Sequence, residues 1–273
     1  MRKTIGLAIA LLLLGLCAAA FLAFQGESTF YTNLFKAYRD GKQFYDNYPY
    51  LARDVAFHPD MSPRLDVYSP PGGARHPVLV FIHGGSWKDY DKEMFAPVAM
   101  KLLPEEMVVV IPDYTLYPDA GYEQMAREVA AALSWTLDNV QEYGGDPDCV
   151  IVAGHSAGGH LAALALMDPR YLADHGRSAA DVRGLLGLSG VYDVQAEYDF
   201  WQAKGIRPRV IEGVMDGSQN LSQASPTYYV RPGLPPVLLI HGDEDRTVPV
   251  EIAIDFHAAL QAAGVPVELN IYG

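Results

Sequence analysis

The chain has 273 residues, half of them hydrophobic, which is enough for one sizeable α/β domain. Acidic residues outnumber basic ones by 33 to 20, giving a net charge of −13. Such a surface repels phosphate backbones and no basic run offsets it, which argues against nucleic-acid binding. The only two cysteines, Cys17 and Cys149, cannot form a disulfide framework and lack metal-ligand spacing, so no cysteine zinc site is visible.

The first predicted element is an apolar helix at the N-terminus. Arg2 and Lys3 precede twenty uncharged residues, 5–24, and a helix of this length is about 30 Å long, enough to cross a bilayer. The alanines at 18–20 could serve as a signal cleavage site, but the apolar run continues past them, which favours an uncleaved anchor. We therefore expect a transmembrane anchor or signal sequence over residues 1–26. The basic N-terminus predicts that the following domain lies on the non-cytoplasmic side, or is secreted or periplasmic if cleavage occurs.

The next segment, residues 27–53, is rich in aromatic side chains. Tyr31, Phe35 and Tyr38 have near-helical spacing, which predicts an amphipathic helix that packs on the following domain. Its closeness to the predicted anchor also allows a position at the membrane interface.

From residue 54 onward, apolar strands alternate with helices. Strands are expected at 65–68, 78–82, 107–111, 149–152, 185–188, 237–240 and 267–272, and helices at 121–143, 157–167 and 251–263. Continuous apolar strands that alternate with helices are typical of a parallel sheet covered on both faces. We therefore predict one α/β domain over residues 54–273 with a mostly parallel, doubly wound sheet.

Residues 192–234 interrupt this alternation between two expected core strands. They carry aromatic side chains among polar ones, and a stretch this long is usually functional or a small subdomain. We interpret it as a small cap over the site; a solvated excursion with its own small core is the alternative.

The most informative motif is Gly154-His155-Ser156-Ala157-Gly158. It follows a run of β-branched residues and precedes an Ala- and Leu-rich helical pattern, so the chain must turn sharply from strand to helix at Ser156. The two glycines remove side chains that would collide at such a turn. This is the sequence context of a nucleophile elbow, in which a serine hydroxyl is exposed at the apex.

A serine nucleophile needs backbone donors for the oxyanion, and Gly84 and Gly85 follow the expected strand at 78–82. We predict that they supply these donors together with the N–H of Ala157. An ordinary tight turn is the alternative reading of the two glycines. His83 is interpreted as a side chain that holds this loop.

The nucleophile also needs an acid to orient its base. Asp243, Glu244 and Asp245 follow the expected strand at 237–240. Asp245 is our choice, because its spacing from His241-Gly242 and Val248-Pro249 resembles the usual acid loop of hydrolases with such an elbow. Asp243 is second and Glu244 third. A solvated acidic turn is the alternative.

The base is the missing part of this set. In this fold the histidine follows the last strand, which is expected to end at Tyr272. His257 has the pattern of a helix-surface residue, His155 occupies the variable position of the elbow, and His160 lies one turn into the next helix with an unfavourable direction. We therefore expect the base, and the C-terminal end of the domain, beyond Gly273.

These motifs resemble those of α/β-hydrolase serine esterases with an HGG oxyanion motif. Within this group the chain is most similar to isoprenylcysteine methylesterase-like and BD-FAE-type carboxylesterases. The resemblance rests on 64–68, 83–87, 143–147, 154–161, 188–192 and 241–245. It implies an α/β-hydrolase fold, Ser156 as the nucleophile and Asp245 as the acid, with no metal or organic cofactor.

The predicted function is hydrolysis of small-molecule carboxylic esters through an acyl-enzyme on Ser156. The aromatic cap favours hydrophobic esters, and the membrane is a second expected partner through the N-terminal helix. Two alternatives remain open: an amidohydrolase of the formamidase type, and a catalytically inactive hydrolase-fold binding protein, because no triad histidine is visible within the sequence.

Overall fold

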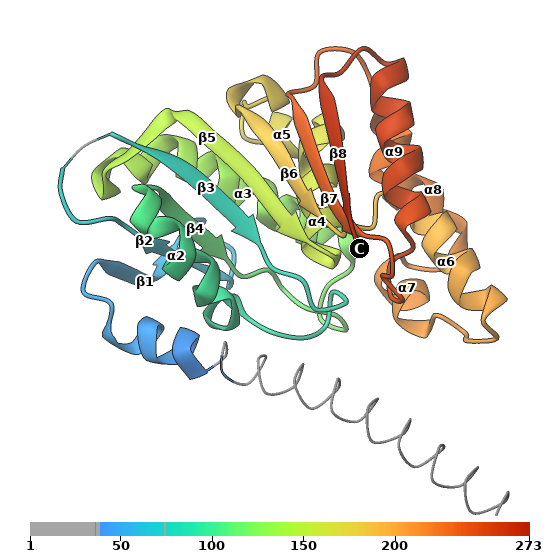
Figure 1. The fold of residues 1–273 in the computed structure, drawn as a ribbon, viewed down its shortest axis with the longest axis horizontal. Helices are drawn as coiled ribbons and strands as arrows, with labels where there is room; N and C mark the ends of the chain where they lie inside the picture. Colours follow the sequence, from blue (N-terminus) through green and yellow to red (C-terminus); the bar gives the residue numbers. More distant parts are fainter. Residues whose placement is uncertain (1–35, 37–38, 74) are drawn as a thin grey trace, which may run out of the picture.

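The computed structural model describes residues 36, 39–73 and 75–273 (Figure 1). Its described part contains an eight-stranded sheet in the order β1-β2-β4-β3-β5-β6-β7-β8. The strands are β1 (Leu51–Ala56), β2 (Arg64–Tyr68), β3 (His76–Ile82), β4 (Val108–Pro112), β5 (Gly145–His155), β6 (Gly184–Leu188), β7 (Val237–Gly242) and β8 (Val267–Tyr272). The β1–β2 and β2–β4 pairs are antiparallel and all other pairs are parallel. The predicted mostly parallel sheet is confirmed.

Helices cover the two faces of the sheet unequally. One face carries α3 (Tyr122–Asn139), α4 (Ala157–Met167), α5 (Pro169–Ala173) and α9 (Val250–Ala262), which share one large apolar cluster with the strands. The other face carries α2 (Ala96–Leu102) and the helical residues 39–47, which share a smaller cluster. The 3-10 turns are η1 (Lys92–Phe95), η2 (Leu103–Glu105), η3 (Val140–Tyr143) and η4 (Ala179–Asp181).

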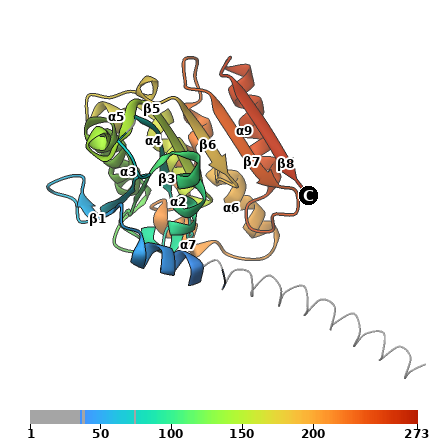
Figure 2. The ribbon, with the colours of Figure 1, turned by 60° about the vertical axis from the view of Figure 1, so that its left-hand side comes forward.

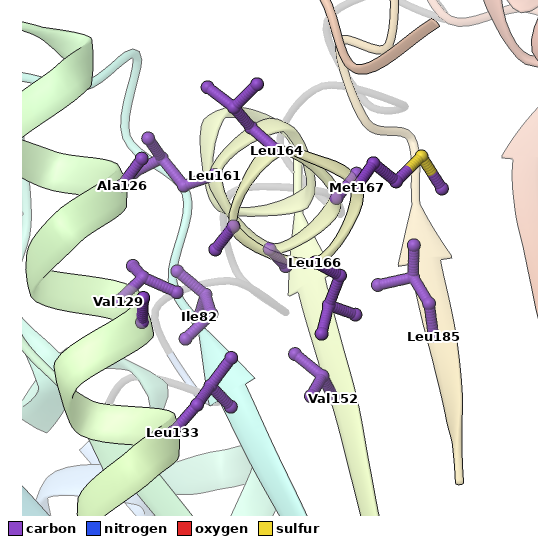
Figure 3. Close-up of a cluster of buried hydrophobic side chains, with 14 of the residues drawn as sticks. Ile82, Ala126, Val129, Leu133, Val152, Leu161, Leu164, Leu166, Met167 and Leu185 are labelled. Atoms are coloured by element: carbon purple, nitrogen blue, oxygen red, sulfur yellow. The ribbon is translucent and has the colours of Figure 1, made fainter. Parts of the chain in front are cut away.

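The helix α4 runs through the centre of the larger cluster. All eleven of its residues are buried, as expected for a helix that is apolar all round. Figure 3 looks along this helix: Leu161 faces Ala126 on α3, and Leu166 lies above Val152 on β5. Asp168 and Pro169 end the helix, because proline disfavours a helical conformation in the residue before it. This packing fixes the first turn of α4 relative to the sheet.

Strands β6 and β7 differ from the predicted two-sided burial. Leu185 and Leu239 are buried on the face under α4 and α9, whereas Leu186 and Leu238 on the opposite face are only half-buried. The burial alternates because this opposite face lies at the margin of the cluster around α2.

The predicted anchor over residues 1–26 lies outside the described residues, and so do Tyr31, Phe35 and Tyr38. Within the part of the chain that the structure describes, no helix is both long and apolar enough to span a membrane. The sheet begins at Leu51, three residues before the expected domain start at 54, because β1 pairs with β2.

The segment 192–234 folds into a group of short helices between β6 and β7. They are α6 (Val194–Ala203), α7 (Arg209–Val214), η5 (Ser218–Asn220), α8 (Leu221–Ala224) and η6 (Pro226–Tyr229). In two views, α6 and α7 lie beyond the arrowheads of the parallel strands (Figures 1 and 2). The carboxyl ends of the strands are where open α/β sheets bind their ligands.

Candidate active site

Ser156 occupies the sharp turn between β5 and α4. Its backbone has φ 53° and ψ −120°, a conformation that costs a non-glycine residue on the order of 1–3 kcal/mol. The turn is held because the Ser156 N–H donates to the Leu188 carbonyl at 2.9 Å and the His160 N–H donates to the Ser156 carbonyl at 3.0 Å. A Cβ at Gly158 would lie 2.1 Å from the Ile82 carbonyl oxygen, so this position admits only glycine. The motif therefore has the geometry of a nucleophile elbow.

The loop after β3 packs directly against this elbow. A Cβ at Gly84 would lie 2.8 Å from the His155 carbonyl oxygen and 3.3 Å from the Ser156 Cβ. Gly85 follows with φ 131°. Ala157 is the first residue of α4, so its N–H has no partner within the helix and lies at the positive end of the helix dipole. The structure thus brings Gly84 and Ala157 next to Ser156, with Gly85 in the same loop.

The His83 side chain holds this loop through a hydrogen bond and ring stacking, as the sequence interpretation suggested. Its Nδ1 donates to the Gly84 carbonyl at 2.9 Å, and its ring stacks on Tyr114 at 4.5 Å between centroids. The Tyr114 hydroxyl in turn donates to the His83 carbonyl at 3.1 Å. Burial lowers the pKa of His83, which keeps the ring neutral and suited to this structural role.

A second buried histidine connects the loop after β3 to the segment 192–234. The Trp87 indole N–H donates to the His160 Nδ1 at 3.1 Å, and the His160 Nε2 lies 2.7 Å from the Ala224 carbonyl. Because an indole can only donate, Nδ1 must accept and Nε2 must carry the proton. Burial lowers the pKa of His160 to about 4. Both nitrogens of this neutral ring are occupied, so His160 is not available as the base.

Asp245 is the acid that the backbone holds in place. Its Oδ1 accepts from the N–H groups of Thr247 at 2.9 Å and Val248 at 3.0 Å, and its side chain is 21% exposed. The two competing acids, Asp243 and Glu244, are exposed. Two backbone amides fix the direction of the Asp245 carboxylate, as an orienting acid requires.

No histidine side chain among the described residues forms a hydrogen bond with the side chain of Ser156 or Asp245. The His241 Nε2 lies 3.6 Å from the Asp245 Oδ2 but donates to the Val248 carbonyl at 2.9 Å. The His155 ring lies beside the loop after β3, because its Nδ1 would be 2.8 Å from a Cβ placed at Gly84. Desolvation lowers the pKa of His155, while the charge of Asp245 opposes this shift. His257 is half-buried on α9 and forms no hydrogen bond with Ser156 or Asp245. The position of the base therefore stays a prediction.

A cavity of about 320 Å³ opens beside Ser156, large enough for a small organic molecule. The helices α6 and α7 form much of its wall. Its apolar lining residues are Trp87, Val191, Trp201, Ile206, Pro208, Val210, Ile211 and Val248, and its polar ones include Lys88, Glu197, Arg207 and Arg209. In the described part of the chain, no cluster of His, Cys, Asp or Glu could hold a metal ion. The arrangement can place an apolar ester against Ser156.

Sequence reasoning missed two pairs of side chains in this region. One is the Trp87–His160 bond, which joins residues far apart in the chain. The other is Glu197 with Trp201 on α6, whose spacing of four residues indicates a helical pair. The spacing alone could not tell which side of α6 faces the cavity.

Comparisons with known proteins agree with this fold. The isoprenylcysteine alpha-carbonyl methylesterase ICME of Arabidopsis thaliana is 28% identical over 235 residues, 81% of this chain and 55% of that protein. Esterase LipQ of Mycobacterium tuberculosis is 30% identical over 222 residues, 77% of this chain and 50% of that protein. The chain thus spans about half the length of the curated relatives it matches.

Solved structures of esterase 2 from Thermogutta terrifontis have a similar fold. The structure phosphorylated by paraoxon matches at a TM-score of 0.68 with 25% identity over 83% of each chain. The propionate-bound structure matches at 0.67 with 26% identity over 84% of this chain and 85% of that one. The BD-FAE family matches residues 65–260, which is more than half of the sequence. The chain therefore belongs to the BD-FAE family and has the α/β-hydrolase fold.

Proposed function

We propose that this protein hydrolyses carboxylic esters through an acyl-enzyme on Ser156. The observation that carries the proposal is the elbow at Ser156, packed against the Gly84 loop and facing an apolar cavity. The relatives named as esterases support the same reaction class.

In the proposed reaction, the Ser156 hydroxyl attacks the ester carbonyl carbon. The N–H groups of Gly84, Gly85 and Ala157 stabilise the negative charge that develops on the carbonyl oxygen. The alcohol leaves with a proton, and water then attacks the acyl-enzyme to release the acid.

Proton transfer requires a base oriented by Asp245. β8 ends beside the acid loop, because the Asp243 N–H donates to the Tyr272 carbonyl at 2.8 Å. In the order of triad residues in this fold, the histidine that acts as the base follows the last strand of the sheet.

The test is turnover of p-nitrophenyl butyrate by the full-length protein, compared with its Ser156→Ala variant. We expect measurable turnover that falls by about 10⁶ in kcat in the variant, the scale seen when a serine nucleophile is removed. Folded protein that hydrolyses neither this ester nor other short acyl esters would favour a binding role. Faster turnover of N-formyl aromatic amides would favour an amidohydrolase.

We also propose that residues 5–24 anchor the protein to a membrane, with the hydrolase domain on the non-cytoplasmic side. The proposal rests on the uncharged length of this run after Arg2 and Lys3. The full chain should sediment with membranes and be released by detergent. Recovery of full-length protein in a high-speed supernatant without detergent would overturn it.

A further inference from the structure

A carboxyl group without a complete set of partners lies in the wall of the cavity beside Ser156. Glu197 lines the cavity and is only 3% exposed. Its Oε1 accepts from the Trp201 indole N–H at 2.6 Å. Its Oε2 is buried and has no hydrogen-bond partner among the described residues. The Oε2 atom of Glu197 is therefore free to take part in a further hydrogen bond.

Such a group is costly to keep inside a protein. A buried polar atom without a partner costs about 1–3 kcal/mol, and more when it is charged. Burial raises the pKa of Glu197 to about 7; the charge of Asp245 adds to the rise, and the Trp201 bond and Lys204 oppose it. If Glu197 only stabilised α6 through its bond to Trp201, one carboxylate oxygen would be sufficient. Unpaired buried groups of this kind are concentrated at functional sites.

The charges around the cavity restrict what can bind to Oε2. Lys88, Arg207 and Arg209 line the same cavity, so a cationic group would meet like charges there. An anionic group without a proton cannot donate a hydrogen bond to an ionised Oε2 and is repelled by its charge. A neutral group remains, and a hydroxyl is the simplest one that can donate to an ionised carboxylate and accept from a protonated one through a single atom.

We propose that Glu197 determines substrate specificity by binding a hydroxyl group on the acyl or alcohol part of the ester, away from the scissile bond. The proposal rests on the esterase function above, because it places the substrate in the cavity beside Ser156. It predicts that esters with a correctly spaced hydroxyl bind more tightly than their deoxy counterparts.

Binding can be tested without turnover by using ketones, which resemble the ester carbonyl but cannot be hydrolysed. The probes are ω-hydroxy methyl ketones of seven to nine carbons, each compared with the ketone lacking the hydroxyl and with its ω-methyl ether. Calorimetry at pH 8, above the pKa of Glu197, gives the Kd of each. We expect the hydroxy ketone of one length to bind roughly ten- to a hundredfold more tightly than both partners, as for one hydrogen bond to a charged group.

Variants then assign this preference to a residue. Glu197→Met should bring the Kd ratio close to one, whereas Glu197→Gln should keep part of it, because its amide still hydrogen-bonds a hydroxyl. Glu251→Gln makes the same chemical change at an exposed position at the start of α9 and should keep the wild-type ratio.

Two results would overturn the proposal. One is a wild-type Kd ratio near one at every chain length, which needs no variant to fold. The other is a hydroxyl preference that survives in Glu197→Met. Both differ from a failure of the esterase proposal, which appears as folded protein that binds these ketones but turns over no ester.

Discussion

Replacing His160 with leucine tests how the loop after β3, residues 83–87, is held. The two side chains are similar in size, so the change mainly removes polar contacts. It leaves the Trp87 indole N–H and the Ala224 carbonyl without their partners in a fully buried region. Each orphaned group costs about 1–3 kcal/mol, so we expect the free energy of unfolding to fall by about 2–6 kcal/mol.

The effect on catalysis follows from the position of Trp87 in the loop. Ser86 and Trp87 both have positive φ, 52° and 59°, and the indole bond to His160 is one of the contacts that hold this unusual backbone. Losing an oxyanion donor costs about 10²–10³ in kcat. A loosened loop should cost less, roughly 10- to 100-fold in kcat, with little change in KM.

A double-mutant cycle isolates the Trp87–His160 bond. Urea unfolding is measured for His160→Leu, Trp87→Phe and the double variant, together with kcat and KM for a short ester. The double variant should lose less stability than the sum of the two single variants, because Trp87→Phe removes the indole N–H that His160→Leu orphans. Additive losses, or His160→Leu within about 1 kcal/mol of wild type with unchanged kcat, would refute the reasoning.

Three further predictions follow from the site. Gly158→Ala should lower the free energy of unfolding by more than about 3 kcal/mol, because its Cβ would meet two backbone carbonyls. Gly73→Ala, where a Cβ has open space, should remain within about 0.5 kcal/mol of wild type by urea unfolding. A mild loss of stability at position 158 would contradict the packing of the elbow. Asp245→Asn should lower kcat by about 10⁴, whereas Asp243→Asn should leave it within roughly tenfold; the reverse pattern would exchange their roles. Because the pKa of Glu197 is raised from 4.5 to about 7, its contribution to the free energy of unfolding falls as pH rises between these values. The Glu197→Gln variant should therefore gain stability relative to wild type from pH 5 to pH 8. A stability difference that does not change with pH would argue against a buried, titrating carboxyl group.

The elements with strong local patterns were predictable from the sequence. The β-branched run of β5, the glycines of the elbow and the all-apolar α4 each determine their own conformation, so the strand-turn-helix unit at Ser156 follows from neighbouring residues. β1 was missed because its sequence, Leu-Ala-Arg-Asp-Val-Ala, is short and its apolar residues are interrupted by Arg53 and Asp54. It forms because β2 offers an edge to pair with.

The contacts that join distant segments were not predictable in the same way. His160 bonds to Trp87 across 73 residues and to Ala224 across 64 residues, and no local pattern specifies either partner. The sequence could name His160 as a residue near the nucleophile, but only the packing of three elements shows that both its nitrogens are occupied. The same holds for Glu197, since the helical pattern of α6 does not say which side faces the cavity.

The most direct test of the central claim is covalent labelling of the protein with a fluorophosphonate probe, followed by mass spectrometry of its peptides. The account predicts a single adduct on Ser156, absent from the Ser156→Ala variant and lost together with ester turnover. Ester turnover without an adduct on Ser156, or an adduct on another residue that accounts for the activity, would contradict it.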